Sequence, residues 1–328
     1  MLLGTHLYLT VILRFPQRYL LKALKLYFVK DHTDKGDISP FSSLMVALAA
    51  NIGAGNIIGV GVAIAAGGPG AVFWCWLTGV LGMATRYSEG LLAIKYRVEN
   101  KDGNMSGGPM FVLERGLNSK WLGTAFAVFT AIAAFGIGNL TQGNAAAEQL
   151  HHAFSIPSWG TAVVLTALTA LVMLGGIRGI ARVCAFFVPF MAVIYILGCL
   201  YILTVQAEYI LPAVRYILDC AFTGEAAAGG AAGAAVMAAM RTGVARGLFS
   251  NEAGLGSAAI ASAAAQNRNP VRQALISSSG PFWDTVIICA LTGIVLTTSI
   301  IAHPDISCTD GPRPVSYTHL TLPTILRV

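Results

Sequence analysis

Two short glycine-rich stretches contain the residues best placed to bind a ligand, G-A-G-N at 53–56 and G-L-G-S at 254–257. Both interrupt apolar runs that are otherwise typical of membrane-spanning helices. Glycine weakens a helix and leaves backbone N–H and C=O groups without intrahelical partners. Because lipid cannot satisfy those groups, broken backbone at that depth must line a cavity within protein. Two such breaks in one chain predict the binding site of a secondary transporter.

The polarity of the helix ends at the two breaks predicts what this site binds. The outer half of the first broken helix should begin with free N–H groups, which suit a carboxylate at the positive end of the helix dipole. These groups belong to Ala54, Gly55, Asn56 and Ile57. The outer half of the second broken helix should end near Ser250, where free carbonyls suit an ammonium group or a small cation. Facing each other, the two ends would bind a small zwitterion such as an amino acid.

The composition places these breaks in an all-α, polytopic membrane protein. Of 328 residues, 55% are hydrophobic and 11% are charged, whereas soluble domains carry roughly 25% charged residues. The net charge of +6 is explained by basic loops, so we expect no nucleic-acid partner. The six cysteines show no C-x-x-C pairing, so we predict no metal site. Without a Ser/His or paired-Asp arrangement at matching depths, we predict no catalytic residues and no enzyme.

Eight segments are predicted to span the membrane, given that about 20 residues cross its hydrocarbon core. They are 2–13, 41–66 with a break at 53–56, 70–92, 121–147, 159–177, 183–205, one span within 228–266 that carries the second break, and 274–302. The Ala/Gly-rich approach to the seventh span is expected to form a separate short helix, 226–240, packed on the outer surface.

The positions of Lys and Arg orient these spans. Every second loop is basic, namely 14–40, 93–120, 178–182 and 267–273. The positive-inside rule places those loops in the cytoplasm and the N-terminus outside.

The two breaks are similar to each other in sequence. N-I-G-A-G-N-I-I from Asn51 aligns with E-A-G-L-G-S-A-A from Glu252, so that Asn56 matches Ser257. Asn and Ser are good N-caps, and each is expected to start the helical half that follows its break. The charge pattern gives the two broken helices opposite directions, as in an inverted-topology repeat. Chance similarity in a chain rich in Gly and Ala is the alternative.

Several longer motifs resemble the alanine or glycine:cation symporter family of prokaryotes. They are G-A-G-N-I-I-G-V-G-V-A-I-A-A-G-G-P-G-A-V-F-W-C-W (53–76), S-G-G-P-M (106–110), G-I-G-N-L-T-Q-G-N (136–144), G-L-F-S-N-E-A-G-L-G-S (247–257) and N-P-V-R-Q (269–273), within a resemblance over residues 2–300. The resemblance implies the LeuT-type fold and uptake of alanine or glycine coupled to Na⁺ or H⁺. We expect a monomer in the lipid bilayer of a prokaryotic plasma (inner) membrane, with no other cofactor. The chain departs from the family at Ala54, where Thr is common.

The same resemblance implies an organisation in four parts. Residues 1–40 form a partial span and a basic loop, 41–205 the first five-helix repeat, 206–302 an outer helix with the first two spans of a truncated second repeat, and 303–328 an atypical tail. Family chains are longer, so we expect these 328 residues alone not to transport. The tail Pro312–Val328 is interpreted as non-native sequence.

The residues predicted to bind substrate lie at the breaks and on the fourth span. They are Gly53, Ala54, Gly55, Asn56, Gln142, Phe249, Ser250, Asn251, Glu252, Gly254 and Gly256. Asn56 either caps a helix only or also faces substrate, and Phe249 is either a pocket wall or ordinary packing. The resemblance favours substrate contact for Gln142 over an interhelical hydrogen bond. Ala50 and Asn51 are expected to contact the cation, with a packed polar role as the alternative for Asn51.

The charged residues within the spans need partners, because uncompensated charge there is costly. Glu252 either braces the second break through a partner such as Arg246 or contacts ligand or ion directly. Arg86 and Glu89 are three residues apart and are predicted to form an ion pair. Asp284 either snorkels to the interface or gates the inner pathway. A channel or a non-transporting membrane subunit is the alternative function, but neither explains two inverted breaks.

Overall fold

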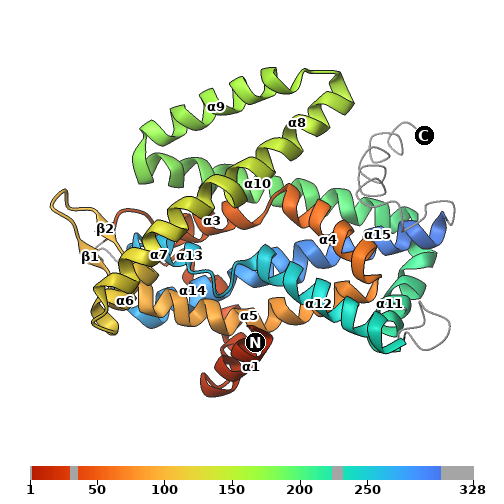
Figure 1. Ribbon diagram of the computed structural model, residues 1–328, viewed down its shortest axis with the longest axis horizontal. Coiled ribbons are helices and arrows are strands. Elements are labelled where there is room, and N and C mark those ends of the chain that lie inside the picture. The colour runs from red at the N-terminus through yellow and green to blue at the C-terminus, as the bar shows by residue number, and fades with distance from the viewer. Residues whose placement is uncertain (1, 30–35, 224–231, 304–328) are drawn as a thin grey trace. The chain divides into compact units, whose positions relative to one another are not determined.

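The computed structural model describes residues 2–29, 36–223 and 232–303, which are helical apart from one short hairpin (Figure 1). The chain divides into two compact units. The first unit comprises Met1–Asn51, Leu81–Phe190 and Glu252–Pro281, and the second comprises Ile52–Val80, Met191–Asn251 and Phe282–Val328. The chain passes between the units after Asn51 and Asn251, just before the two predicted breaks, and also after Val80, Phe190 and Pro281.

Each predicted span corresponds to helical structure. The first four are α1 (Leu2–Ile12), the broken pair α3 (Pro40–Asn51) and α4 (Ala54–Gly67), α5 (Gly70–Lys95), and α7 (Lys120–Ala133) continued by the π-helix η2 (Ala134–Leu140) and α8 (Thr141–Phe154). The last four are α9 (Ser158–Leu174), α10 (Gly176–Val205), the pair α12 (Ala232–Asn251) and α13 (Ser257–Ala263), and α14 (Pro270–Ser278) followed by the π-helix η3 (Phe282–Cys289) and α15 (Ala290–Ala302).

Two helices among the described residues, 176–205 and 270–302, are long and apolar enough to cross a membrane. The bent pair 40–51 and 55–67 adds a third if its halves are counted as one broken span. The seventh predicted span needs a correction. Residues 232–240 do not form a separate helix but continue without interruption to Asn251 in α12, because an Ala-rich run favours uninterrupted helix. Residues 226–231 and 304–328 lie outside the described residues.

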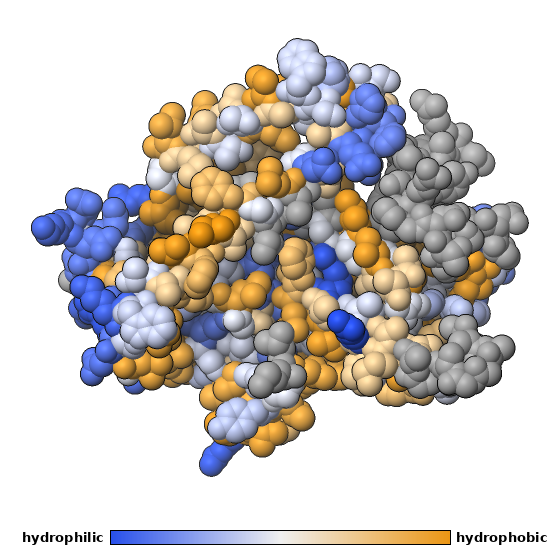
Figure 2. All heavy atoms as spheres, viewed as in Figure 1, coloured by the Kyte–Doolittle hydropathy of each residue, from blue (hydrophilic) through white to orange (hydrophobic). Residues whose placement is uncertain are grey.

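Several elements lie in segments that the sequence analysis treated as loops. They are η1 (Pro16–Tyr19), α2 (Leu20–Leu26), the antiparallel strands β1 (Val98–Glu99) and β2 (Met105–Ser106), α6 (Pro109–Gly116) and α11 (Ala207–Phe222). Hydrophilic side chains gather over the β1–β2 hairpin in the first unit (Figure 2). In contrast, Leu171 and Leu174 on α9 and Phe186 on α10 expose more than half of their surface, as expected for side chains that face lipid.

In the first unit, the half-helices α3 and α13, which are predicted to be the inner halves of the two broken spans, are held together by hydrogen bonds. Ser43 donates a hydrogen bond from Oγ to the Ala261 carbonyl over 2.9 Å. A parallel bridge joins Ile38 to Ala265. The guanidinium of Arg97 donates to three carbonyls just after α13, at distances of 2.7–3.0 Å; they belong to Ala263, Ala265 and Asn267. Most of these contacts end on backbone oxygen, so they fix the path of the chain.

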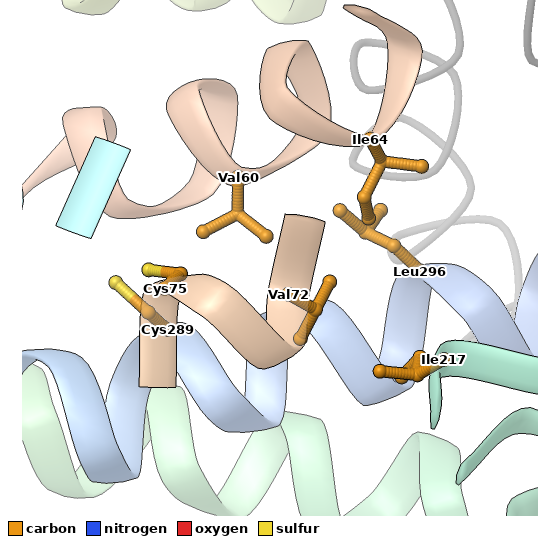
Figure 3. Close-up of a cluster of buried hydrophobic side chains, with 7 residues drawn as sticks. All are labelled: Val60, Ile64, Val72, Cys75, Ile217, Cys289 and Leu296. Carbon is orange, nitrogen blue, oxygen red and sulfur yellow. The ribbon is translucent and has the colours of Figure 1, made fainter. Parts of the chain in front are cut away.

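In the second unit, α4, α5, α11, η3 and α15 share one apolar cluster (Figure 3). Its buried members are Val60, Ile64, Val72, Cys75, Ile217, Cys289 and Leu296. Glycine on α12 allows that helix to lie directly against its neighbours. A Cβ at Gly247 would be 1.8 Å from Thr78 Oγ1 on α5, and a Cβ at Gly67 on α4 would be 1.9 Å from Thr242 Oγ1 on α12. Small residues permit this close packing of membrane helices.

Candidate functional site

The first break lies where the sequence predicted it, but a different residue caps the helix. α3 ends at Asn51 and α4 begins at Ala54. Gly53 is the N-cap, with an extended backbone, and its carbonyl accepts a hydrogen bond from the Asn56 N–H over 3.0 Å. The expectation that Asn56 starts the helix was therefore wrong, because the helix reaches three residues further back. The N–H of Asn56 also has a partner, contrary to expectation. Because Gly53 is the cap, the side chain of Asn56 is free to make other contacts.

The second break is also confirmed, between the end of α12 at Asn251 and the start of α13. Glu252, Gly254 and Gly256 all have positive φ, at 50°, 99° and 79°. Gly256 is the N-cap of α13, so the expected capping role of Ser257 was wrong as well. The Ser257 hydroxyl donates instead to Oε2 of Glu252. Glu252 therefore braces the second break from within it, through a partner other than the expected Arg246.

Asn56, Ser250 and Asp284 meet in the interior of the second unit. Asn56 Nδ2 donates to Oδ1 of Asp284 over 2.6 Å, and Ser250 Oγ donates to Oδ2 of the same carboxylate over 2.8 Å. Thr285 adds a third bond to Oδ2, also of 2.8 Å. Asn56, Ser250 and Asp284 are each at most 2% exposed. One side chain from each broken helix thus meets a buried carboxylate, and we call these three residues the polar cluster.

The polar cluster holds more acceptor oxygens than protons. Ser250 Oγ lies 2.8 Å from Asp284 Oδ2 and 3.1 Å from Asn56 Oδ1, yet a hydroxyl has one proton to donate. The Cys289 thiol, 3.2 Å from Ser250 Oγ, can complete the bonding of that hydroxyl but adds no proton between the two oxygens. With Asp284 ionised, only one of these two oxygen contacts can be a hydrogen bond. A small cation among these oxygens would satisfy the other contact, because carboxylate, amide and hydroxyl oxygens suit hard cations.

Arg246 lies beside the polar cluster on α12. Its guanidinium donates to the Gly55 carbonyl in the first turn of α4. The Cζ atom lies 5.1 Å from the centre of the Phe249 ring, within the range of a cation–π contact. The side chain also fills the space beside Gly59, where an added Cβ would be 1.8 Å from Cζ. This basic residue therefore packs against α4 at the level of the first break.

In the first unit, the carboxylate of Glu89 binds the backbone of the second break. Its Oε1 accepts hydrogen bonds from the N–H groups of Gly254, over 2.8 Å, and Gly256, over 3.2 Å. The predicted ion pair with Arg86 is confirmed, with 3.6 Å between Nη1 and Oε2. The ion pair was predicted from the sequence, but the contact of Glu89 with the second break was not. The spacing of two residues on α5 does not indicate which backbone amides they face.

The remaining predicted residues are divided between the units. Phe249 and Asn251 belong to the second unit together with the polar cluster, while the first unit contains Ala50, Asn51, Gln142, Glu252, Gly254 and Gly256. Asn51 and Asn251 are buried, Ala50 is exposed, and Gln142 is half-buried on α8. Asp284 is fully buried, which excludes snorkelling. The sequence analysis did not place it in the site, and its only signal was an ionisable group within an apolar span.

The sequence of this chain is similar to proteins of a known family. A sequence profile described as the sodium:alanine symporter family matches residues 1–321, including part of the tail interpreted as non-native. The sodium/alanine symporter AgcS of Methanococcus maripaludis is 52% identical over 304 residues, which cover 90% of this chain and 66% of AgcS.

Two further relatives show the breadth of the similarity. An uncharacterized transporter of Haemophilus influenzae is 53% identical over 298 residues, 90% of this chain and 65% of that protein. The probable sodium/glutamine symporter GlnT of Bacillus subtilis is 36% identical over 305 residues, 92% of this chain and 63% of GlnT. The chain spans about two thirds of the length of the curated relatives it matches. These matches show that the chain belongs to the sodium:alanine symporter family.

Proposed function

We propose that the complete carrier to which this chain belongs is a secondary active transporter that couples uptake of alanine or glycine to Na⁺. The single observation that carries the proposal is the polar cluster, in which side chains from both broken helices converge on a buried carboxylate. Helix ends at such breaks are where transporters of this kind bind their substrates and ions. Membership of a sodium:alanine symporter family supports the same function. The channel alternative is not favoured.

The amino acid would bind at the first break, beside the polar cluster of the second unit. The N-terminus of α4, a 14-residue helix, offers the backbone N–H groups of Ala54 and Gly55 to the substrate carboxylate. Asn56 and Ser250, which contact each other, lie beside this helix N-terminus. The side chain of Phe249, 43% exposed, can form a wall against the substrate methyl group. Gln142, Asn251, Glu252, Gly254 and Gly256 complete the proposed substrate-binding set, with Gly53 shaping the turn.

The coupling cation would bind at the polar cluster. With Asp284 ionised, Asn56 Oδ1, Ser250 Oγ and Asp284 Oδ2 share one donated proton, although their two short contacts need one each. Na⁺ fits oxygen ligands of this kind, and its charge would be balanced by the carboxylate. Ala50 and Asn51, at the end of the inner half-helix α3, remain proposed as further cation contacts. A proton carried by Asp284 is the second candidate, because the same carboxylate could bind one.

We further propose the LeuT-type arrangement with an inverted repeat, a first repeat over 41–205 and the start of a second over 206–302. The proposed setting is the plasma membrane of a prokaryote, with a monomer whose N-terminus lies outside. Opposite directions of the two broken helices support this topology. Labelling of single cysteines placed in the segment 14–40 and in the connection 155–157 between α8 and α9 of the complete carrier tests the orientation. Labelling of 14–40 from outside the cell would contradict it.

Transport itself can be tested with the complete carrier in proteoliposomes. An inward Na⁺ gradient should drive accumulation of labelled alanine, and K⁺ in place of Na⁺ should abolish it. A proton gradient imposed without Na⁺ separates the two coupling ions. Uptake that responds to neither gradient would contradict the proposed function, and a competition panel of small amino acids would rank alanine against glycine.

A further inference from the structure

Arg246 is the charged residue beside the site that the proposed transport cycle leaves without a role. It lies four residues before Ser250 on α12, so the two side chains share one face of the helix. A charged group within a membrane helix is costly, and such groups are commonly functional. Both its contacts and its charge can act on the polar cluster.

The guanidinium is held on three sides, which makes it a fixed charge. It donates to the carbonyl of Gly55, the residue next to Asn56. Phe249 covers it at 5.1 Å from Cζ to the ring centre. Gly59 leaves the space that it fills, because a Cβ there would lie 1.8 Å from Cζ. A side chain held this firmly fixes the first turn of α4, and Asn56 with it.

The same charge acts on the carboxylate of the cluster. Arg246 interacts electrostatically with Asp284. Within the described residues of the second unit, the other titratable groups facing Asp284 are the thiols of Cys289 and, behind it, Cys75; the uncharged donors are Asn56, Ser250 and Thr285. The positive charge of the guanidinium therefore acts on the carboxylate to which the cation would bind. A fixed positive charge beside a cation site lowers its affinity for the cation.

We propose that Arg246 is a positioning residue with two separable effects: its contact with Gly55 orients the first turn of α4 for the amino acid, and its charge weakens the binding of Na⁺ so that the ion is released in each cycle. This inference rests on the proposed function of the polar cluster. The direction of the change in Na⁺ affinity when the charge is removed distinguishes the charge effect from structural damage, because damage at the site would lower the affinity and could not raise it.

Three variants of the complete carrier separate these effects by Na⁺ and alanine titrations of uptake. Arg246→Met should raise the apparent Na⁺ affinity roughly tenfold, because one unit charge is removed, and should lower the maximal rate because release is slower. Arg246→Lys keeps the charge but lacks the planar fork, so Na⁺ affinity should stay near the wild-type value while the KM for alanine rises several-fold. Arg241→Met is the matched control, an exposed arginine of the same helix, and should change neither.

Gly59→Ala tests the same contact without touching the charge. The added Cβ must displace the guanidinium, so the KM for alanine should rise as in Arg246→Lys. Gly198→Ala is the control, because its Cβ would meet open space.

The outcomes distinguish failure of this inference from failure of the proposed function. If the wild-type carrier shows no Na⁺-driven uptake, the proposed function fails. If the wild type transports and Arg246→Met binds Na⁺ with equal or lower affinity, the charge effect is overturned. If Arg246→Met does not elute as folded protein in size-exclusion chromatography, the KM for alanine of Arg246→Lys and Gly59→Ala tests the inference instead. Wild-type KM values for alanine in both variants would overturn it.

Discussion

The two half-helices of the second unit, α4 and α12, are organised differently from the two of the first unit, α3 and α13. We call them the outer pair and the inner pair, after the sides of the membrane proposed for them. Where the outer pair meets in the second unit, buried side chains with binding chemistry converge: an amide, a hydroxyl and a carboxylate, with a guanidinium beside them. Where the inner pair meets in the first unit, the contacts end mainly on backbone carbonyls. The side chains that could bind a ligand therefore lie where the outer pair meets, whereas the contacts of the inner pair fix the path of the chain.

The largest expected effect follows from removing the carboxylate of Asp284 on η3, which contacts both members of the outer pair. Asp284→Asn retains the size of the side chain but loses the charge that would balance a cation. We expect Na⁺-driven uptake of alanine by the complete carrier to fall by roughly 100-fold or more, since charge-assisted contacts are the strongest in such a site. Initial rates in proteoliposomes measure it, with Asp219→Asn, an exposed carboxylate on α11, as the control. Uptake above a tenth of the wild-type rate would contradict the role given to Asp284.

A smaller effect is expected from the hydroxyl that links α12 to the cluster. Ser250→Ala removes the bond to Asp284 Oδ2, and loss of a hydrogen bond to a charged group costs about 1.5–3 kcal/mol. The concentration of Na⁺ for half-maximal uptake should rise roughly tenfold or more. Cys289→Ala is the matched control, because it removes the neighbour of Ser250 at 3.2 Å but leaves the oxygens in place. Equal effects of the two substitutions would show that packing, and not the hydroxyl, matters.

The inner pair should respond in stability and not in ion affinity. Arg97→Met removes the hydrogen bonds from the guanidinium to three carbonyls at and just after the end of α13. We expect a loss of about 2 kcal/mol, faster amide hydrogen exchange over 263–267, and an unchanged Na⁺ affinity in the variant that remains folded. Arg115→Met, an exposed arginine on α6, should show none of these changes. A large change in Na⁺ affinity for Arg97→Met would remove the distinction between the pairs.

The smallest effect is expected where α12 packs on α5. Gly247→Ala places a Cβ 1.8 Å from Thr78 Oγ1, and such overpacking costs about 1 kcal/mol where a side chain can turn aside. The thermal unfolding midpoint should therefore fall modestly, while Gly198→Ala leaves it unchanged. A midpoint equal to that of the wild type would show that α12 does not depend on this close approach.

The sequence predicted the breaks because glycine pairs inside apolar runs have a direct physical consequence. It also placed Asn56 and Ser250, 194 residues apart, in one predicted site. It could not place Asp284, because which face of a span is buried depends on the helices packed around it. The two N-caps were predicted at Asn56 and Ser257 from side-chain preference, yet both caps are glycines: Gly53, with an extended backbone, and Gly256, in the left-handed region that favours glycine. Helices such as α11 were missed because their charged residues resembled those of a loop.

Equilibrium binding of radioactive sodium to the purified complete carrier needs no transport cycle and therefore reports on the polar cluster alone. We expect saturable Na⁺ binding by the wild type and by Asp219→Asn, and loss of that binding in Asp284→Asn. Saturable binding of Na⁺ by Asp284→Asn with the wild-type affinity would contradict the claim that the buried polar cluster holds the coupling ion.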